Sequence, residues 1–339
     1  MRALYCGVDL HSSNAVYGVT DDQDHVLFRK RLPNRLPVIL DALSPFREDL
    51  KVVAVESTYN WYWLVDGLMD HGYPVSLANP AAMEQYSGLK DANDESDALF
   101  LAQLSRLNIL PTGYIYPKEE RPVRDLLRRR SLLVRHRTAL VLSLQNMLMR
   151  EAGCSLSWRK IRQQGDDLPG LLKDQDVLPF VAQQQIELIE QLNKKIELFE
   201  KKVLEKAKLK PAYERLLTMP GVGQILALTI MLETGAVERF CGVGNYTSYC
   251  RCVRAQRISN GQCKGSNNGK NGNKYLAWAF VEAAHQAIRY CPKAKAFYDR
   301  KKAKRNGALA TKALAAKWAK AAYYVMKRQE PFDLKRVFG

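Results

Sequence analysis

Residues 3–20, ALYCGVDLHSSNAVYGVT, decide the fold of the N-terminal third of the chain. The apolar run at 3–9 ends in an acid, residues 14–20 alternate between apolar and polar side chains, and residues 26–30 follow a polar turn with a third such segment. Alternation with a period of two is typical of strands. The opening therefore predicts an antiparallel meander of three strands.

The next sixty residues alternate between helix and strand patterns. KVVAV at 51–55 is short and solidly apolar, as expected of a central strand that is buried on both faces. Segments 35–47 and 61–71 have helical patterns, and YPVSLA at 73–78 is typical of another strand. This order predicts an α/β sheet covered by helices.

Two long helices are expected in the middle of the chain. Residues 119–150 have one continuous helical pattern, and residues 121–160 hold ten Lys and Arg against two acids. In the second helix, apolar residues repeat with 3-4 spacing at Ile189, Leu192, Ile196, Phe199 and Val203. That spacing indicates a short coiled-coil seam, whose partner is either the first long helix or another subunit.

The C-terminal third is predicted to be mainly helical. LTMPGVG at 217–223 is similar to a helix-hairpin-helix turn, in which Gly221 and Gly223 offer backbone N–H groups to a DNA phosphate, although a tight interhelical turn explains it equally well. The Gly-, Asn- and Lys-rich segment 259–274 is predicted as a loop. We expect three parts: an α/β domain at 1–115, a basic helix and coiled coil at 116–210, and a C-terminal domain at 211–339.

The charge balance points to a polyanionic partner. Lys and Arg total 52 and Asp and Glu total 35, which gives a net charge of +17. Nucleic acid is the partner that such a surplus favours. No long apolar run indicates a membrane span, and the N-terminus lacks the pattern of a signal peptide. The seven cysteines, including Cys250, Cys252 and Cys263, lack paired zinc spacing, so we expect reduced, buried thiols in a cytoplasmic protein.

Four acids occupy suggestive positions in the N-terminal region. Asp9 ends the first strand, Glu56 ends the buried strand, and Asp94 and Asp97 lie three residues apart at the start of a helical pattern. Converging carboxylates repel one another and need a counter-ion, and Mg²⁺ or Mn²⁺ suits hard oxygen ligands. Each acid also has a structural interpretation, such as a turn for Asp9 or a helix N-cap for Asp94. Glu56 is the hardest to explain in that way, because an acid directly after VVAV is costly unless it is satisfied.

GVDLHS, VAVESTYNWYW and KDANDESDALFLAQL, in that order, resemble the Asp-Glu-Asp-Asp transposases of the 110 family of bacterial insertion sequences. The resemblance continues through LLTMPGVGQILALTIMLETG and SNGQCKGSNNGKNGNKYLAWAFVEAA, and SNGQCKG resembles the eleven-eleven subgroup more than the type members of the family. It implies a RuvC-like domain of the ribonuclease-H fold, with Asp9, Glu56, Asp94 and Asp97 as metal-binding catalytic acids. It also implies a serine nucleophile in the C-terminal domain, oligomers (dimers or tetramers) with composite active sites, DNA as substrate and a structured guide RNA encoded by the element.

Ser259 is the favoured nucleophile, and Ser266 is the alternative, because Asn260 occupies the place before the glycine where the family often has serine. A turn-forming role explains Ser259 structurally. We expect Lys264, Lys270 and Lys274 to hold DNA phosphates around the serine, and expect the same of Arg128, Arg129 and Arg130, for which a solvated basic face is the alternative.

Two other functions fit the same residues. One is a RuvC-like nuclease or Holliday-junction resolvase, in which water is the nucleophile. The other is a non-catalytic nucleic-acid-binding scaffold that assembles through the coiled coil. The four acids favour an enzyme that cuts and rejoins DNA over both.

Overall fold

The computed structural model of the chain describes residues 2–89, 94–153, 155–164, 172, 176–207, 210–253, 256–266 and 271–339. The chain forms two compact units. The first comprises Met1–Lys118 with Ser266–Asn271, and the second comprises Glu119–Gly265 with Gly272–Gly339.

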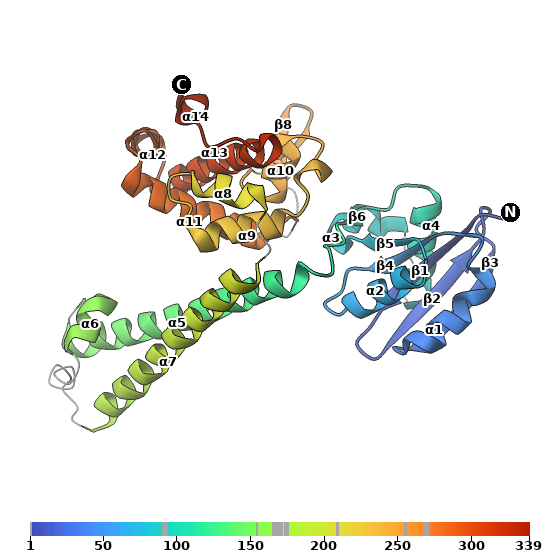
Figure 1. The fold of residues 1–339 in the computed structure, drawn as a ribbon, viewed down its shortest axis with the longest axis horizontal. Coiled ribbons are helices and arrows are strands. Elements are labelled where there is room, and N and C mark those ends of the chain that lie inside the picture. The colour runs from blue at the N-terminus through green and yellow to red at the C-terminus, as the bar shows by residue number, and fades with distance from the viewer. Residues whose placement is uncertain are drawn as a thin grey trace. The chain divides into compact units, whose positions relative to one another are not determined.

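The first unit contains a six-stranded mixed sheet of order β3-β2-β1-β4-β5-β6 (Figure 1). Its strands are β1 (Leu4–Leu10), β2 (Asn14–Thr20), β3 (Val26–Pro33), β4 (Leu50–Glu56), β5 (Val75–Ala78) and β6 (Thr112–Gly113). The first three strands are antiparallel neighbours, which confirms the predicted meander. Strands β1, β4 and β5 are parallel, so their C-terminal ends lie at one edge of the sheet.

Helices cover the two faces of this sheet. One face packs Cys6 and Val8 of β1 into a core with α1 (Leu36–Leu43) and α2 (Tyr62–Asp70). The other face carries Gly7, where α4 (Asp94–Arg106) contacts β1, β2 and β4. A Cβ atom on Gly7 would lie 1.9 Å from the Ala98 carbonyl oxygen, so only glycine lets α4 approach β1 this closely. The short helix α3 (Pro80–Met83) follows β5.

The second unit begins with a long helical hairpin. Helix α5 (Arg121–Ala152) packs along α7 (Val177–Lys206), and α6 (Trp158–Gln164) lies near their far ends (Figure 1). Ile189, Ile196 and Val203 of the predicted seam are buried. The seam therefore packs against α5 of the same chain, which answers the question that the sequence left open.

The remaining elements of the second unit are mostly helices. They are α8 (Pro211–Leu217), α9 (Gln224–Thr234), α10 (Val243–Tyr249), α11 (Lys274–Tyr290), α12 (Pro292–Lys304), α13 (Gly307–Arg328) and α14 (Leu334–Phe338), with the strands β7 (Gln256–Ser259) and β8 (Gln262–Ser266). Leu127 of α5 and Val203 of α7 belong to the same core as these helices. Residues 119–265 and 272–339 thus belong to one compact unit, and the boundary that we predicted between 116–210 and 211–339 stays a prediction.

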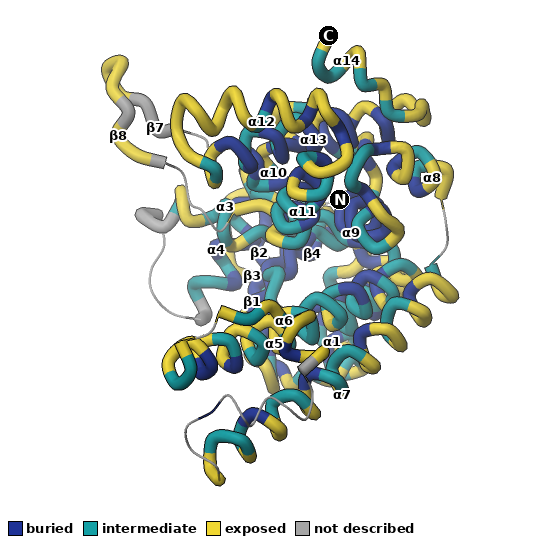
Figure 2. Tube along the Cα trace, turned by 90° about the vertical axis from the view of Figure 1, so that its left-hand side faces the viewer, coloured by how far each residue is buried: buried dark blue, intermediate teal, exposed yellow. Residues whose placement is uncertain are grey.

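The core of this unit is built around α13. The Trp318 side chain is fully buried, donates a hydrogen bond to the Pro220 carbonyl at 2.9 Å, and packs against Phe332 and Phe338. Figure 2 shows buried residues along α11 and α13 and exposed residues along the outside of α12. Within the described residues, none of the helices has an apolar stretch of the length needed to cross a membrane.

Candidate active site

Strand register places two of the predicted acids side by side. Gly7 of β1 pairs with Ala54 of the parallel strand β4, and Val8 pairs with Val55. One residue further along the same register, Asp9 comes opposite Glu56. Because side chains alternate between faces, both acids share the face of Gly7 and Ala54, which is the face that α4 covers.

The third acid lies on the covering helix. Asp97 of α4 immediately precedes Ala98, whose carbonyl oxygen lies against Gly7. Four residues after Asp97, Leu101 packs on Ala54 in a small apolar cluster. Asp97 is half-buried. The close packing of Gly7 thus brings the start of α4 to the sheet edge that carries Asp9 and Glu56.

The backbone of Asp94 begins α4, and its side chain lies outside the described residues. Among the side chains that the structure describes, no group of three or more His, Cys, Asp or Glu residues is gathered closely enough to hold a metal ion. The described part of the site is therefore a strand-end pair of carboxylates with one carboxylate on the helix above. These donors are all carboxylate oxygens, a chemistry that fits a hard divalent cation.

His11 is a neighbour of this site that the sequence analysis missed. The Asp9 side chain is 7% exposed, and its Oδ2 lies 3.4 Å from the His11 Nε2. The Asn60 side chain donates a hydrogen bond to the His11 carbonyl at 2.9 Å, and Asn34 donates another at 3.1 Å. The Asp-x-His spacing of Asp9 and His11 was the available signal in the sequence.

The predicted serine lies at the tip of a hairpin. Strands β7 and β8 form a two-stranded sheet joined by Asn260 and Gly261, which both have positive φ, 49° and 71°. Two positive values are what a type I′ turn requires, and Asn-Gly is its preferred sequence. The prediction of a loop from residue 259 onward was therefore wrong for 259–266.

The turn explains the place of Ser259. Ser259 is the last residue of β7, it is exposed, and Gln262 faces it across the two-residue turn. Lys264 is exposed and, two residues after Gln262, shares the face of Ser259 by strand alternation. The hairpin thus presents a hydroxyl beside a cation. The side chains of Ser266 and Lys270 lie outside the described residues.

A buried ionic network fixes the chain at Asn273, which follows the hairpin in the sequence and precedes α11. Arg128 of α5 donates hydrogen bonds to both carboxylate oxygens of Glu233 at 2.6 and 2.7 Å, and the Glu233 side chain is 1% exposed. Asn273 donates to the same carboxylate at 2.8 Å and caps α11 by accepting from Tyr275 N at 2.8 Å. The Asn273 N–H in turn donates to the Tyr249 carbonyl. Asn273, and with it the start of α11, is therefore fixed to α5, α9 and α10.

Comparison with known proteins is consistent with this arrangement. Residues 6–151 match the family model of DEDD transposases of the IS110 type, and residues 213–299 match that of the "Transposase IS116/IS110/IS902 family". A "Probable family 20 transposase" of Pseudomonas aeruginosa is 25% identical over 284 residues, 81% of each chain. The "Transposase for insertion sequence element IS1111A" of Coxiella burnetii is 24% identical over 68% of this chain and 63% of its own.

This chain belongs to the IS110 family of transposases. It is accordingly a DNA strand-transferring enzyme, and the resemblance found in the sequence is confirmed. The IS1111A transposase is among the relatives that match, and membership of the eleven-eleven subgroup stays a prediction.

Two of the three arginines of α5 that we predicted to contact phosphates form ion pairs within the transposase. Arg128 is held by Glu233, with its guanidinium carbon 4.6 Å from the centre of the Tyr275 ring. Arg130 pairs with Glu200 of α7. Arg129 is exposed, so of the three arginines it is the one placed for a phosphate contact.

The predicted helix-hairpin-helix turn of the transposase joins α8 to α9. Gly221 has a φ of +83°, and a Cβ atom there would lie 2.5 Å from the Ala283 carbonyl oxygen of α11. The close packing of α11 therefore explains why residue 221 is a glycine. Gly223 precedes α9 and has open space around its Cα, so a phosphate contact stays a prediction at that residue alone.

Two of the three clustered cysteines are buried thiols, as predicted. Cys250 is fully buried and Cys252 is 6% exposed. Burial raises the pKa of the Cys252 thiol to about 12 and that of Cys250 well above its ordinary value. Thiols held in the protonated form are poor metal ligands. The side chain of Cys263 lies outside the described residues.

Proposed function

We propose that this transposase cuts and rejoins DNA through a covalent serine intermediate, with carboxylates of the first unit holding divalent cations. The observation that supports the proposal is the β1–β4 register, which pairs Val8 with Val55, so that the next residues, Asp9 and Glu56, follow at the carboxyl ends of two parallel strands. Carboxylates at such an edge, beneath a helix that brings a third acid, are the arrangement expected of a metal-dependent phosphodiester site.

The sheet supports a finer assignment of the fold. Three antiparallel strands, β3, β2 and β1, followed in space by the parallel strands β4 and β5, are the order expected of a ribonuclease-H-like domain. A helix across the central strands completes that pattern, and α4 contacts β1, β2 and β4. We infer a RuvC-like ribonuclease-H fold for the first unit.

The acids suit Mg²⁺ or Mn²⁺. Asp9, Glu56 and Asp97, together with Asp94, would hold the cation through carboxylate oxygens. When bound, the cation would supply charge stabilisation for the phosphate under attack. His11 contacts the Asp9 carboxylate, and the packing of α4 on Gly7 excludes solvent from one side of the acids.

Ser259 would act as the nucleophile. Its Oγ attacks the phosphorus, the Oγ–P bond forms, one P–O ester bond of DNA breaks, and the serine proton passes to the released DNA hydroxyl. In the second step a hydroxyl of another strand attacks the phosphoserine, and the proton returns to Ser259. One ester bond replaces another in each step, so joining needs no external energy source. Lys264, on the same hairpin face, would position the phosphate.

We propose further that a structured guide RNA and a dimer or tetramer take part. The net charge of +17 would allow the protein to bind an RNA in addition to a short DNA site. Arg129 and Lys274 are exposed, so their side chains could contact phosphates of either nucleic acid. Sequencing the RNA that co-purifies with the protein tests this. A transcript from the flanks of the protein's own gene is expected, and random cellular RNA would contradict the proposal.

A donor plasmid that carries the gene with its genomic flanks tests the metal site. Asp9→Asn and Glu56→Gln should reduce strand transfer to background while leaving the protein folded, because each removes an anionic ligand. Asp41→Asn is the matched control, since Asp41 is an exposed acid on α1, over the opposite face of the sheet. Full transfer by either site variant would refute the metal-site proposal.

The same assay separates the serine mechanism from a RuvC-like hydrolase. The serine mechanism predicts joined products and a protein-linked strand, with both lost in Ser259→Ala. Free ends with no protein-linked strand, and an unaffected Ser259→Ala variant, would show that water is the nucleophile.

A further inference from the structure

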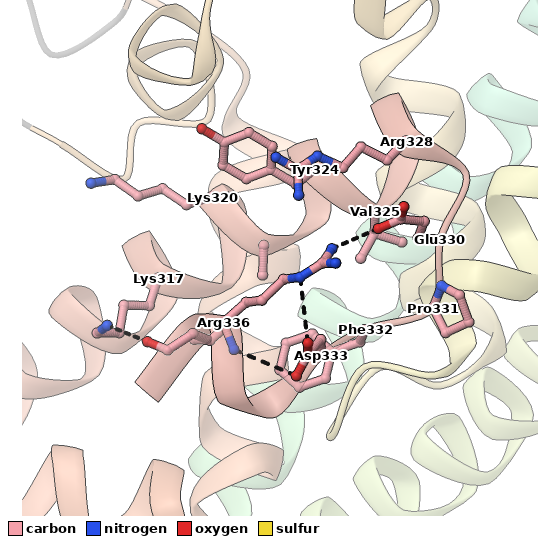
Figure 3. Close-up of a pocket in the computed structure, with 12 residues that line it drawn as sticks. Lys317, Lys320, Tyr324, Val325, Arg328, Glu330, Pro331, Phe332, Asp333 and Arg336 are labelled. Carbon is pink, nitrogen blue, oxygen red and sulfur yellow. Dashed lines mark hydrogen bonds and ion pairs between the residues drawn. The ribbon is translucent and has the colours of Figure 1, made fainter. Parts of the chain in front are cut away.

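The second unit contains a cavity that the strand-transfer mechanism does not use. It has a volume of about 400 Å³ and lies between the last turns of α13 and the C-terminal segment that leads into α14 (Figure 3). This volume falls within the roughly 300–1,000 Å³ typical of ligand pockets. Its lining combines apolar and aromatic side chains with cations.

The apolar part of the cavity is packed against the core of the second unit. Ala321 and Val325 of α13 line it and are buried, and Phe332 packs against the buried Trp318 with ring centres 5.8 Å apart. The Phe332 N–H donates to the Thr218 hydroxyl at 2.8 Å, which fixes the opposite wall to the end of α8. The cavity is therefore formed before any ligand arrives.

An aromatic ring and a guanidinium lie at its mouth. Tyr324 is 41% exposed, a high value for a tyrosine on a helix that is otherwise largely buried. The guanidinium carbon of Arg328 lies 4.8 Å from the centre of the Tyr324 ring. Aromatic rings and arginine planes are the two surfaces on which unstacked nucleotide bases stack.

The cations of the lining fall into two groups. Arg336 pairs with Glu330 at 2.6 Å and with Asp333 at 3.4 Å, and Lys317 donates to the Val337 carbonyl at 2.7 Å. These contacts hold the cavity wall together, as the dashed lines in Figure 3 show. By contrast, neither Lys320 nor Arg328 has an acidic partner among the side chains that the structure describes.

The surroundings are strongly positive. Residues 291–339 contain fourteen Lys and Arg against three acids. The pKa of Lys317 is lowered by burial and then by the nearby charges of Lys320, Arg300 and Lys301. These like charges repel one another, so an anion that binds among them stabilises this surface.

We propose that this cavity binds an unstacked base of a single-stranded nucleic acid. The base stacks on Tyr324 beside the Arg328 guanidinium, and Lys320 contacts a flanking phosphate. An isolated anion would have no use for the aromatic and apolar lining, and duplex DNA has no free base to insert. The site would hold a single strand of the nucleic acid on which the transposase acts, and its occupancy does not depend on the identity of the nucleophile.

Binding of labelled single-stranded oligonucleotides to the full chain tests the proposal. Tyr324→Ala should weaken binding about 5-fold or more, the effect of losing one base–aromatic stack. Tyr324→Phe should bind like wild type because it keeps the ring. Tyr290→Ala is the matched control, since Tyr290 is 75% exposed elsewhere in the same unit. Thermal unfolding checks that each variant is folded.

An oligonucleotide with abasic residues sharpens the result. Wild type and Tyr324→Ala should bind this abasic strand equally, because it offers phosphates without bases. The same measurements with RNA and with DNA oligonucleotides show which kind of strand supplies the base. The proposal would be overturned if Tyr324→Ala lost as much affinity for the abasic strand as for the normal strand, or if Tyr290→Ala lost as much affinity as Tyr324→Ala. It would also be overturned if an acidic peptide displaced the labelled oligonucleotide at a lower concentration than an unlabelled oligonucleotide does. Lys320→Ala should lower the slope of log binding constant against log salt by about 1, and Lys320→Arg should not. An unchanged slope in Lys320→Ala would remove the phosphate contact.

Discussion

The carboxylates of the first unit and the serine of the second unit are held in opposite ways. The acids lie where two parallel strands end under a closely packed helix, and the Asp9 side chain is almost wholly buried. Ser259 lies at the exposed tip of a two-residue hairpin, and the described anchor that follows this hairpin is Asn273, which donates a hydrogen bond to the buried Glu233. The acids are thus positioned by the packing of a whole unit, and the serine by a turn and an anchor.

This difference teaches how each part tolerates change. A metal site needs several ligands held to within a fraction of an ångström, which a packed sheet edge supplies. A nucleophile that forms a covalent bond with one strand and then releases it needs access on all sides, which a hairpin tip supplies. Substitutions in the supporting residues should therefore be costly around the acids and at the Asn273 anchor, and mild at the hairpin tip.

The largest effect on stability is expected at the anchor that follows the hairpin. Glu233→Ala removes the buried partner of Arg128 and one bond of Asn273, and should destabilise the second unit by about 3–5 kcal/mol. Glu200→Ala is the matched control, because Glu200 of α7 pairs with Arg130 of the same helix α5 but its side chain is 32% exposed, so a loss of about 1 kcal/mol or less is expected. Denaturant unfolding measures both. If both variants lost the same free energy of unfolding, the buried Glu233 pair would contribute no more to stability than the partly exposed Glu200 pair.

A smaller effect separates the two glycines that shape the site. Gly7→Ala forces a methyl group onto the Ala98 carbonyl and should cost about 3 kcal/mol, the upper range for overpacking. Gly261→Ala meets no atom within 4 Å, and its cost of about 1–2 kcal/mol comes from the positive φ of 71° alone. Chemical denaturation of the two variants should keep that order. If Gly261→Ala lowered the free energy of unfolding as much as Gly7→Ala, the contrast between the packed sheet at Gly7 and the exposed hairpin tip at Gly261 would be contradicted.

Sequence patterns predicted the first unit well for physical reasons. Apolar runs that end in acids at Asp9 and Glu56 identify strand ends directly, and parallel strands then bring those ends to one edge. The helical pattern of KDANDESDALFLAQL likewise indicated α4, although not the glycine contact that holds it in place. That contact depends on residues 91 positions apart, Gly7 and Ala98, which no local pattern relates.

The second unit was harder to predict. The Asn260–Gly261 pair is a strong hairpin signal, but the flanking QRIS and QCKGS lack apolar alternation, and the surplus of Gly, Asn and Lys favoured a loop. The role of Arg128 was hidden because its partner Glu233 lies 105 residues away at the end of an apolar helix. An acid within LALTIMLETG was the available sign that a buried cation lay nearby.

The identity of the residue that joins to DNA tests the account most directly. Trypsin cuts after Arg257 and Lys264, so residues 258–264, ISNGQCK, carry Ser259 as their only hydroxyl side chain, and Ser266 falls in the next peptide, 265–270. After reaction with donor DNA, nuclease digestion and mass spectrometry, we predict a nucleotide mass on 258–264, which disappears in Asp9→Asn. The same mass on 265–270, or free DNA ends with no linked peptide at all, would contradict the account.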